Sequence, residues 1–451
     1  MTGPGARSTT SGRRLQLATG ITEVLTSLRR SLSGGEEVVT APLPPSGPER
    51  RQTCAMLQPG LPITEPDAAA IVATSGSTGR PRGVVLSRSA LIASADATAA
   101  RLGGYGSWVL ALPAHYVAGL MVLVRAVCGG RPVHPVDGRL AGLPYLVEHE
   151  LSLTEGPTYT ALVPTQLSRA LADPVLTNAL TRFDAVLLGG AAADPSLLER
   201  ASTAGIRVVT TYGMSETCGG CVYDGLPLDG VSVTTDNRGR ISIGGPTLFS
   251  GYRLDPAATA DVLVDGRLRT RDRGQWVGNR LTVLGRLDDI VISGGMNVDL
   301  ATVERAVRSW VAETGRNDGL TEPTAGAGAM NTVSDAAVVG VPHPEWGTEV
   351  VAVVETGQRP RLVQDPRPDS AVPATRGGRL SLSALRHSLS AELPHYALPR
   401  RLLIQTLPRT SGGKIDRRRL VADLSAPAVS EPTVGDPAAS EPTFSEPSES
   451  T

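Results

Sequence analysis

Short apolar runs that alternate with segments of helical length constrain the fold of this chain more than any other feature. Three of these runs, each ending in glycine or proline, lie at Tyr159–Pro164, Ala185–Gly190 and Ile206–Gly213. Strands that alternate with helices are typical of a mostly parallel α/β sheet, in which the carboxyl ends of neighbouring strands meet at one edge. Ligands bind at that edge in such folds, so we expect functional residues to follow these runs.

The chain length and a later change of pattern predict more than one domain. At 451 residues the chain exceeds what one hydrophobic core usually supports. After Val231, short alternating strands predict a small β region that closes a large mixed α/β domain, and the run from Arg286 predicts a smaller α+β domain. A final segment that contains SEP three times cannot bury a core. We therefore predict a disordered N-terminus at 1–14, a large domain at 15–285, a smaller C-terminal domain at 286–424 and a disordered tail at 425–451.

Local patterns predict particular elements near the N-terminus. The apolar spacing from Leu15 to Arg30 predicts an amphipathic helix. Further along, Ala68–Gly79 predicts a buried strand that enters a loop, and Arg82–Ser87 predicts the second strand of the same hairpin. We expect Ser87 to cap a helix that follows directly.

Charge, hydropathy and cysteine usage exclude several classes of protein. The formal net charge of −1 gives no basic field for nucleic acid. No apolar run approaches the length of a membrane span, about 18 residues, and the polar start carries no secretory signal. We therefore expect a cytoplasmic enzyme without membrane insertion, and a homodimer is left open. Cys218 and Cys221 form a CxxC pair without a second pair or a histidine couple, so packing explains them better than zinc or redox chemistry.

The loop at 74–79, TSGSTG, has the composition of a phosphate-binding loop. Its glycines permit close approach of a ligand, and its backbone N–H groups and hydroxyls suit phosphate oxygens. It is not a Walker loop, because no Gly-Lys-Ser or Gly-Lys-Thr closes it. A plain hairpin turn is the alternative interpretation of the loop taken alone.

Four further motifs follow this loop in order along the chain. They are TTYGMSETCGG at 210–220, RTRDRGQW at 269–276, GRLDDIVISGGMN at 285–297 and LPRTSGGKIDRRRL at 407–420. With the loop, they resemble the adenylate-forming superfamily of acyl-CoA synthetases, luciferases and peptide-synthetase adenylation domains, over about residues 65 to 420. The resemblance implies that a carboxylate attacks the α-phosphate of ATP, with magnesium, and that the thiol of coenzyme A then displaces AMP. It also implies that the smaller domain is mobile.

The resemblance implies a nucleotide site that extends from the phosphate loop to an aspartate near residue 270. Tyr212 would offer its ring to adenine and Asp272 would accept hydrogen bonds from both ribose hydroxyls. The glycines at 189–190 have a second explanation, because a tightly packed strand end also needs them. The complete set is Thr74, Ser75, Gly76, Ser77, Thr78, Gly79, Arg82, Gly189, Gly190, Ala191, Tyr212, Gly213, Met214, Asp272 and Arg286.

The resemblance also implies catalytic and hinge residues. Ser215 would reach the α-phosphate, and Glu216 with Thr78 would hold magnesium, which prefers one or two carboxylates plus phosphate oxygens. Lys414 would bridge the acyl carboxylate and the α-phosphate, where a cation stabilises the charge of the transition state. Asp288 would be the hinge between the domains. The thioester-forming face would contain Ser293, Gly294 and Gly295.

Two residues depart from the family pattern. Most members carry lysine at the position of Arg82, so here a planar guanidinium group replaces a compact ammonium group. Arg271 stands where members usually carry glycine, next to the aspartate that would bind ribose.

The acyl substrate is predicted from the segment at 110–127, LALPAHYVAGLMVLVRAV, which resembles the wall of the acyl pocket in CoA ligases. The amino-acid sequences of this and neighbouring segments are most similar to those of actinobacterial o-succinylbenzoate–CoA ligases of menaquinone synthesis. That similarity implies 2-succinylbenzoate as the acid. The polar candidates near it are His115, Tyr116, Thr165 and Gln166. For His115, a core histidine or a gate for the CoA channel are equally open interpretations. Three alternatives stay open: a ligase for another aryl or short-chain acid, a phosphoryl-transfer ATPase, and a non-catalytic nucleotide-binding protein.

Overall fold

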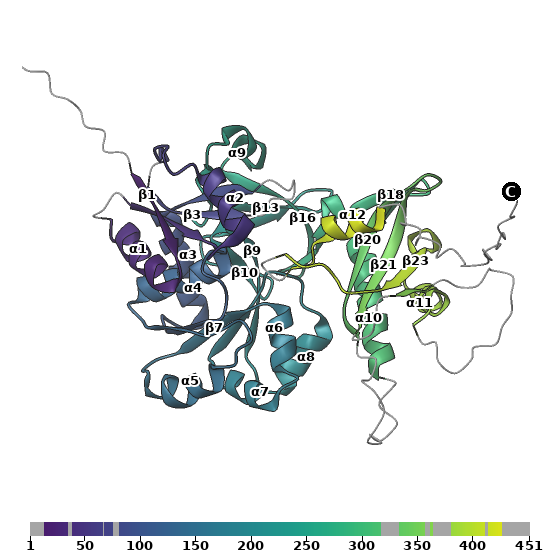
Figure 1. The fold of residues 1–451 in the computed structure, drawn as a ribbon, viewed down its shortest axis with the longest axis horizontal. Helices are drawn as coiled ribbons and strands as arrows, with labels where there is room; N and C mark the ends of the chain where they lie inside the picture. The colour runs from purple at the N-terminus through teal and green to yellow at the C-terminus, as the bar shows by residue number, and fades with distance from the viewer. Residues whose placement is uncertain are drawn as a thin grey trace, which may run out of the picture.

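The computed structural model describes residues 13–34, 38–65, 67–74, 81–316, 333–356, 361–363, 380–410 and 414–425. The disorder predicted for 1–12 and 426–451 lies outside these residues. The described chain folds into a large domain of three sheets and a smaller domain built on a fourth, which lie side by side in Figure 1. The predicted α/β class with a large and a smaller domain is confirmed.

The central sheet of the large domain has seven strands in the order β11-β10-β9-β8-β7-β5-β6. The run from β9 to β6 is parallel, whereas β10 and β11 are antiparallel. The three apolar runs singled out in the sequence form β7, β8 and β9, as predicted. The strands are β5 Ser107–Leu110, β6 Val133–Pro135, β7 Thr158–Leu162, β8 Ala185–Leu188, β9 Val208–Met214, β10 Gly219–Tyr223 and β11 Leu226–Pro227.

A second sheet has the order β1-β2-β3-β4-β14 and contains the predicted hairpin. The hairpin strands β3 and β4 are antiparallel, and the Oγ of Ser87 accepts a hydrogen bond from the backbone N–H of Ala90, so the predicted helix cap is confirmed. The strands are β1 Arg14–Thr19, β2 Val38–Leu43, β3 Ala68–Thr74, β4 Arg82–Ser87 and β14 Gly251–Tyr252.

The helix predicted from Leu15 to Arg30 is wrong in its first third. Residues 14–19 form β1, which pairs in parallel with β2, and the helix α1 begins only at Ile21. Apolar residues at every second position, Leu15 and Leu17, fit a strand once a partner is available. Gly20, at φ +80°, separates the strand from the helix. The strand also begins within the segment 1–14 that was predicted to be disordered.

The two remaining sheets are built mainly from antiparallel strands, with one parallel pair, β21 and β23, in the smaller domain. The predicted small β region is the sheet β12-β13-β16-β15, with β17 paired to β16. The smaller domain contains the order β19-β18-β21-β23-β22, with β20 paired to β21. The strands are β12 Ser232–Thr235, β13 Arg240–Gly244, β15 Leu263–Val264, β16 Arg267–Val277, β17 Arg280–Arg286, β18 Ile290–Ser293, β19 Met296–Asp299, β20 Val333–His343, β21 Gly347–Thr356, β22 Arg361–Val363 and β23 Arg401–Ile404.

Helices cover the sheets in layers. Helices α3 and α4 lie between the first two sheets within one apolar cluster, and α5 to α8 cover the other face of the central sheet. The small-domain sheet packs against α10 and α11 on one face and α12 on the other. The helices are α1 Ile21–Ser33, α2 Gly47–Leu57, α3 Arg88–Leu102, α4 Val117–Gly129, α5 Leu143–His149, α6 Pro164–Ala170, α7 Pro174–Leu180, α8 Pro195–Thr203, α9 Pro256–Val262, α10 Leu300–Arg316, α11 Leu382–Leu389 and α12 Arg417–Ser425.

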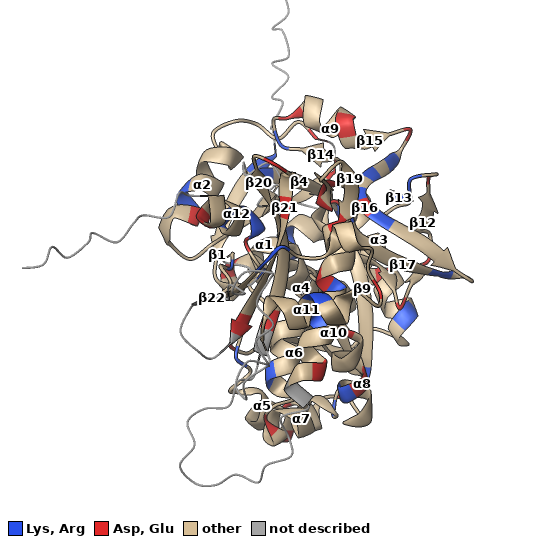
Figure 2. Cartoon of the chain, turned by 90° about the vertical axis from the view of Figure 1, so that its right-hand side faces the viewer, with Lys and Arg blue, Asp and Glu red and all other residues tan. Residues whose placement is uncertain are grey.

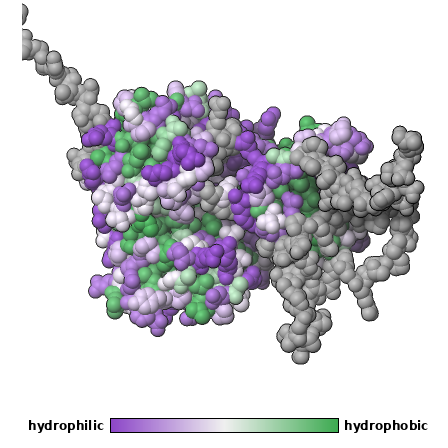
Figure 3. Space-filling model, viewed as in Figure 1, coloured by the Kyte–Doolittle hydropathy of each residue, from purple (hydrophilic) through white to green (hydrophobic). Residues whose placement is uncertain are grey.

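Charged and apolar residues of the described chain are distributed over many elements. Basic and acidic residues are interspersed along the ribbon in Figure 2. Apolar and hydrophilic residues are mixed over the face seen in Figure 3. Within the described residues, no helix has both the length and the apolar character needed to cross a membrane.

Candidate functional site

The predicted ligand edge of the central sheet carries residues from four neighbouring strands. His115 follows β5, Thr165 lies in the first turn of α6 after β7, and Gly189 follows β8. Tyr212 lies near the carboxyl end of β9. Because β5, β7, β8 and β9 are adjacent and parallel, these residues lie at the same edge of the sheet.

Tyr212 and Asp272 form a pair suited to a nucleoside. The Tyr212 hydroxyl donates a hydrogen bond of 2.8 Å to Oδ2 of Asp272 on β16. Arg286 lies opposite Asp272 in the β16–β17 register, and its Nη1 is 3.7 Å from Oδ1 of Asp272. Burial and the neighbouring Asp272 raise the pKa of Tyr212, so its hydroxyl remains a neutral donor. The pair presents an aromatic ring and an ionisable acceptor together, which fits adenine and ribose hydroxyls.

Three glycines allow the backbone to pack closely around this pair. A Cβ atom on Gly189 would lie 2.3 Å from Oγ1 of Thr211, and one on Gly213 would lie 2.0 Å from the carbonyl oxygen of Gly219. Gly190 has a φ of +83°, which favours glycine. Ala191 follows Gly190 at the surface, and Met214 ends β9. The close approach of Gly189 to Thr211 and the positive φ of Gly190 support the packing explanation of these glycines, and their contact with a nucleotide stays a prediction.

Lys414 reaches this edge from the smaller domain. A Cβ atom on Gly190 would lie 3.9 Å from Cε of Lys414. In Figure 1 the yellow segment before α12 runs from the smaller domain towards β9 and β10. The lysine keeps access to solvent, yet the protein atoms around it displace enough water to lower its pKa. Arg286 also lowers this pKa and Asp272 opposes the shift. The fold thus gathers Gly190, Asp272, Arg286 and Lys414 from distant parts of the chain.

Ion pairs anchor the lysine segment on both sides. The Arg409 guanidinium is 2.8 Å from a carboxylate oxygen of Asp335 and 2.9 Å from one of Glu355. After the lysine, Arg417 is 2.8 Å from Glu304 on α10. The backbone N–H of Thr410 donates to the carbonyl oxygen of Lys414 at 2.8 Å. The lysine therefore belongs to a segment that is tied to the sheet and helix of the smaller domain.

Ser215 and Glu216 follow β9 in a short 3-10 turn, Ser215–Thr217. Ser215 is buried and Glu216 is half-buried. Oε1 of Glu216 accepts a hydrogen bond of 2.8 Å from the hydroxyl of Tyr252 on β14. No spacing pattern in the sequence pointed to Tyr252, because β14 reaches Glu216 only through its pairing with β4.

The described ends of the phosphate loop lie on the hairpin next to Tyr252. Oγ1 of Thr74 donates to the carbonyl oxygen of Arg82 at 3.4 Å. Cζ of Arg82 is 5.0 Å from the centroid of the Tyr252 ring, and its Nε is 4.0 Å from Asp255. The predicted phosphate-binding residues Ser75, Gly76, Ser77, Thr78 and Gly79 lie outside the described residues.

The candidate acyl residues lie at the same edge, His115 on the loop after β5 and Thr165 in the first turn of α6. The rings of His115 and Tyr116 have centroids 4.3 Å apart, and the Tyr116 hydroxyl donates to Oε1 of Glu49 at 2.7 Å. Burial lowers the pKa of His115 and Glu49 opposes this shift, so the imidazole is neutral near pH 7. Thr165 is half-buried at the start of α6.

Asp288, the predicted hinge residue, accepts hydrogen bonds from two arginines. Nη1 of Arg271 is 3.2 Å and Nη2 of Arg286 is 3.3 Å from Oδ2 of Asp288. The arginine that departs from the family pattern therefore contacts the predicted hinge. Sequence reasoning had not linked these two positions.

Ser293 ends β18, and Gly294 and Gly295 form the turn between β18 and β19. Ser293 is buried, and both glycines have positive φ angles, +57° and +79°. The backbone N–H of Gly294 donates to the carbonyl oxygen of Trp346 at 3.0 Å. This turn joins β18 to β19, whereas Lys414 lies between β23 and α12, so the two candidate sites come from different segments of the smaller domain.

The two cysteines of the CxxC pair lie in the core, and Glu216 is the carboxylate that could hold a metal at this edge. Cys218 and Cys221 are free, fully buried thiols in the core, and burial raises the pKa of Cys221 to about 12, which supports the packing interpretation. Among the described residues, no group of three or more His, Cys, Asp or Glu residues could hold a metal. Tyr252 engages one oxygen of Glu216, and the second oxygen suits a magnesium ion whose other ligands are phosphates and water.

Comparisons with known proteins agree with this geometry. The chain matches the AMP-binding enzyme family over residues 21–250 and the AMP-binding enzyme C-terminal domain over residues 327–414. A probable 2-succinylbenzoate–CoA ligase from Mycobacterium tuberculosis is 39% identical over 408 residues, which are 88% of this chain and 94% of that protein. A 2-succinylbenzoate–CoA ligase from Geobacillus kaustophilus is 29% identical, covering 91% of this chain and 78% of that protein.

Solved structures share the fold. The o-succinylbenzoate CoA synthetase from Bacillus subtilis, in complex with its acyl-adenylate intermediate, aligns with a TM-score of 0.66 at 21% identity, over 91% of this chain and 96% of that one. ATP-bound MatB from Rhodopseudomonas palustris aligns with a TM-score of 0.66 at 20% identity, over 92% of this chain and 97% of that one. The two-domain architecture is therefore common to these chains.

Proposed function

This chain belongs to the AMP-binding enzyme family, and we propose that it is a 2-succinylbenzoate–CoA ligase that forms acyl-AMP and then acyl-CoA. The observation that carries the chemistry is the position of Lys414, which reaches from the smaller domain to the Tyr212–Asp272 pair. The similarity to the mycobacterial relative over almost its whole length carries the choice of acid. We place the reaction in the cytoplasm, in menaquinone biosynthesis.

ATP binding is assigned to residues at the edge of the central sheet. Tyr212 stacks on adenine, beside the turn that contains Gly190. Asp272 accepts hydrogen bonds from the ribose hydroxyls, and Arg286 lies opposite it on the next strand. The loop at 74–79 and Arg82 hold the β- and γ-phosphates. Magnesium, held by Glu216 and Thr78 together with phosphate oxygens, neutralises charge on the phosphates when it is bound.

Acyl-AMP forms when an oxygen of the acid carboxylate attacks the α-phosphorus and pyrophosphate leaves. The Lys414 ammonium holds the carboxylate and an α-phosphate oxygen together, and it stabilises the negative charge that gathers on phosphorus. Ser215 donates to the same phosphate. For the second step the smaller domain, 286–424, rotates at Asp288 and brings the Ser293–Gly295 turn towards the acyl group, so that the thiol of CoA displaces AMP.

The acid lies near the loops that follow β5 and β7. His115 is neutral, so it contributes a hydrogen bond and not a charge to the acyl group. Thr165 offers a hydroxyl at the first turn of α6. These two groups are our candidates for polar contacts to the second carboxylate or the ketone of 2-succinylbenzoate.

The test is CoA-dependent AMP release with 2-succinylbenzoate against benzoate, short-chain acids and fatty acids. We expect strong turnover with 2-succinylbenzoate and formation of AMP and pyrophosphate. Strong turnover of another acid, with no turnover of 2-succinylbenzoate, would show that the chain is a CoA ligase for that other acid. Release of ADP would assign phosphoryl transfer, and no turnover with any acid would favour a non-catalytic nucleotide-binding protein.

Replacement of Arg82 by alanine is expected to raise the KM for ATP by about tenfold, because a hydrogen bond from a charged donor is worth about 1.5–3 kcal/mol. Replacement by lysine keeps the positive charge and is expected to be mild. The measurement is the ATP dependence of pyrophosphate release at saturating acid. An alanine variant with an unchanged KM for ATP would refute this role for Arg82.

A further inference from the structure

We propose that Tyr252 is a positioning residue for ATP, which sets the Glu216 carboxylate for magnesium and the Arg82 guanidinium for the outer phosphates. The proposal rests on the function proposed above. Tyr252 lies outside the five sequence motifs that resemble the family. Tyr252 touches neither the metal nor the phosphates, and acts through the two charged side chains that it contacts.

The backbone places Tyr252 beside the phosphate-loop hairpin. Tyr252 pairs with Val84 in the β14–β4 register, and the backbone N–H of Arg253 donates to the carbonyl oxygen of Gly83 at 2.7 Å. The Arg253 side chain is buried and donates to the carbonyl oxygens of Leu57 and Pro62. The segment that carries Tyr252 is thus fixed on both sides.

The hydroxyl of Tyr252 orients Glu216. It donates to Oε1 of Glu216 at 2.8 Å, while the backbone N–H of Phe249 donates to the carbonyl oxygen of Glu216 at 2.9 Å. One short segment, 249–252, therefore holds both the side chain and the main chain of Glu216.

The ring of Tyr252 orients Arg82 without neutralising it. The guanidinium carbon is 5.0 Å from the ring centroid, which is within the range of a cation–π contact. The carboxylate of Asp255 is 4.0 Å from Nε of Arg82, and its side chain is 43% exposed, so this ion pair is weak. The arginine is restrained in direction and keeps donors for phosphate oxygens.

Tyr252 contacts two opposite charges. The Arg82 guanidinium lies over its ring, Glu216 accepts a hydrogen bond from its hydroxyl, and no ion pair joins Arg82 to Glu216 within the described residues. A direct Arg82–Glu216 pair would occupy the metal ligand and the phosphate ligand with each other. Tyr252 therefore keeps both groups available for the magnesium complex of ATP.

The test compares Tyr252→Phe with Tyr252→Leu by calorimetric titration of ATP, with magnesium and in EDTA. The Phe variant keeps the ring and loses the donor, so we expect affinity for ATP to fall by about tenfold with magnesium and to stay unchanged in EDTA. The Leu variant loses the ring as well, and we expect weaker binding under both conditions.

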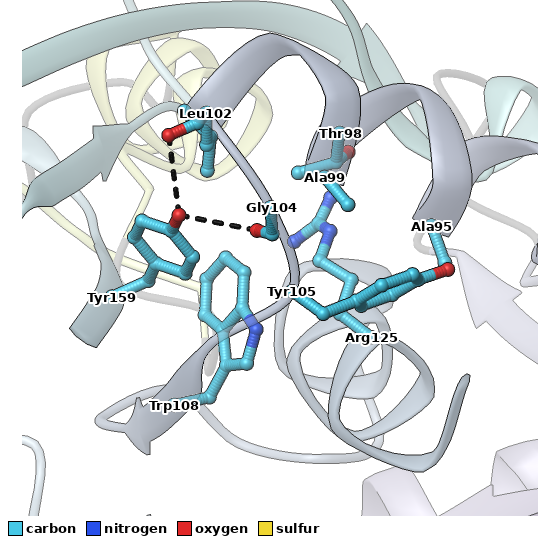
Figure 4. A pocket seen from close by; sticks show the side chains of 9 residues that line it. All are labelled: Ala95, Thr98, Ala99, Leu102, Gly104, Tyr105, Trp108, Arg125 and Tyr159. Carbon is cyan, nitrogen blue, oxygen red and sulfur yellow. Dashed lines mark hydrogen bonds between the residues drawn. The ribbon is translucent and has the colours of Figure 1, made fainter. Parts of the chain in front are cut away.

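Tyr159→Phe is the matched control. Figure 4 shows the Tyr159 hydroxyl beside Leu102 and Gly104, whose carbonyl oxygens accept its hydrogen bonds at 3.2 and 3.1 Å. This variant removes a buried tyrosine hydroxyl away from β14. We expect it to lower Tm while leaving the magnesium dependence of ATP binding as in the wild type.

Two outcomes overturn the proposal. One is a Tyr252→Phe variant that binds ATP as the wild type does with magnesium. The other is an equal loss with and without magnesium, which would show a merely structural role. Since the titration contains neither acid nor CoA, an error in the proposed substrate leaves its result intact, and only the product assay above reports that error.

Discussion

Replacement of Lys414 by alanine is expected to lower the rate of acyl-AMP formation by about a hundredfold to a thousandfold, which is the usual cost of losing one preorganised electrostatic group. Thioester formation from supplied acyl-AMP should stay close to the wild-type rate, because the proposed thioester face is a separate turn. The two half-reactions are measured as pyrophosphate exchange into ATP and as CoA-dependent release of AMP from synthetic acyl-AMP.

Arg418→Ala is the control for the lysine variant. Arg418 is an exposed cation four residues further along, on α12. Its removal changes the net charge by the same amount and should leave both half-reactions unchanged. An equal loss of both half-reactions in Lys414→Ala would contradict the assigned role.

Replacement of Gly213 by alanine is expected to lower the free energy of unfolding by about 3 kcal/mol or more and to abolish ATP binding. Gly213 pairs with Gly220 in the β9–β10 hairpin, and a Cβ atom would lie 2.0 Å from the carbonyl oxygen of Gly219. The neighbour is backbone, so it cannot turn aside as a side chain would. The hairpin must separate, and Tyr212 moves with it. Thermal unfolding and ATP titration measure the two effects.

Gly142→Ala provides the same chemical change in an open position. A Cβ atom on Gly142 would have no atom within 4 Å, and the residue has a φ of −81°. We expect this variant to match the wild type in stability and in affinity for ATP. A Gly213→Ala variant that did the same would show that the hairpin accommodates the methyl group.

The central sheet and the hairpin could be predicted because their signals are local. Each apolar run at Tyr159, Ala185 and Ile206 is bounded by turn residues, and Ser87 carries its own capping group. The run from Leu15 to Arg30 was misjudged because its first residues become a strand only when β2 supplies a partner. The alternation of Leu15 and Leu17 is too short to distinguish a strand from the start of a helix without that partner.

The candidate site was predictable where a motif contains its residues, and not where the fold brings single residues together. Asp272 and Lys414 lie in sequence motifs that resemble those of the adenylate-forming superfamily. Tyr252 lies on a two-residue strand, and only its pairing with β4 brings it to Arg82 and Glu216. Arg271 and Asp288 are likewise 17 residues apart in the sequence, and their side chains meet only because β16 and β17 pair.

The ion pairs of Arg409 and Arg417 have a consequence for how the first step is switched off. They tie the residues on both sides of Lys414 to the smaller domain. If that domain rotates at Asp288 as proposed, Lys414 would move with it as one body. The rotation alone would then remove the ammonium from the phosphate and end the first step.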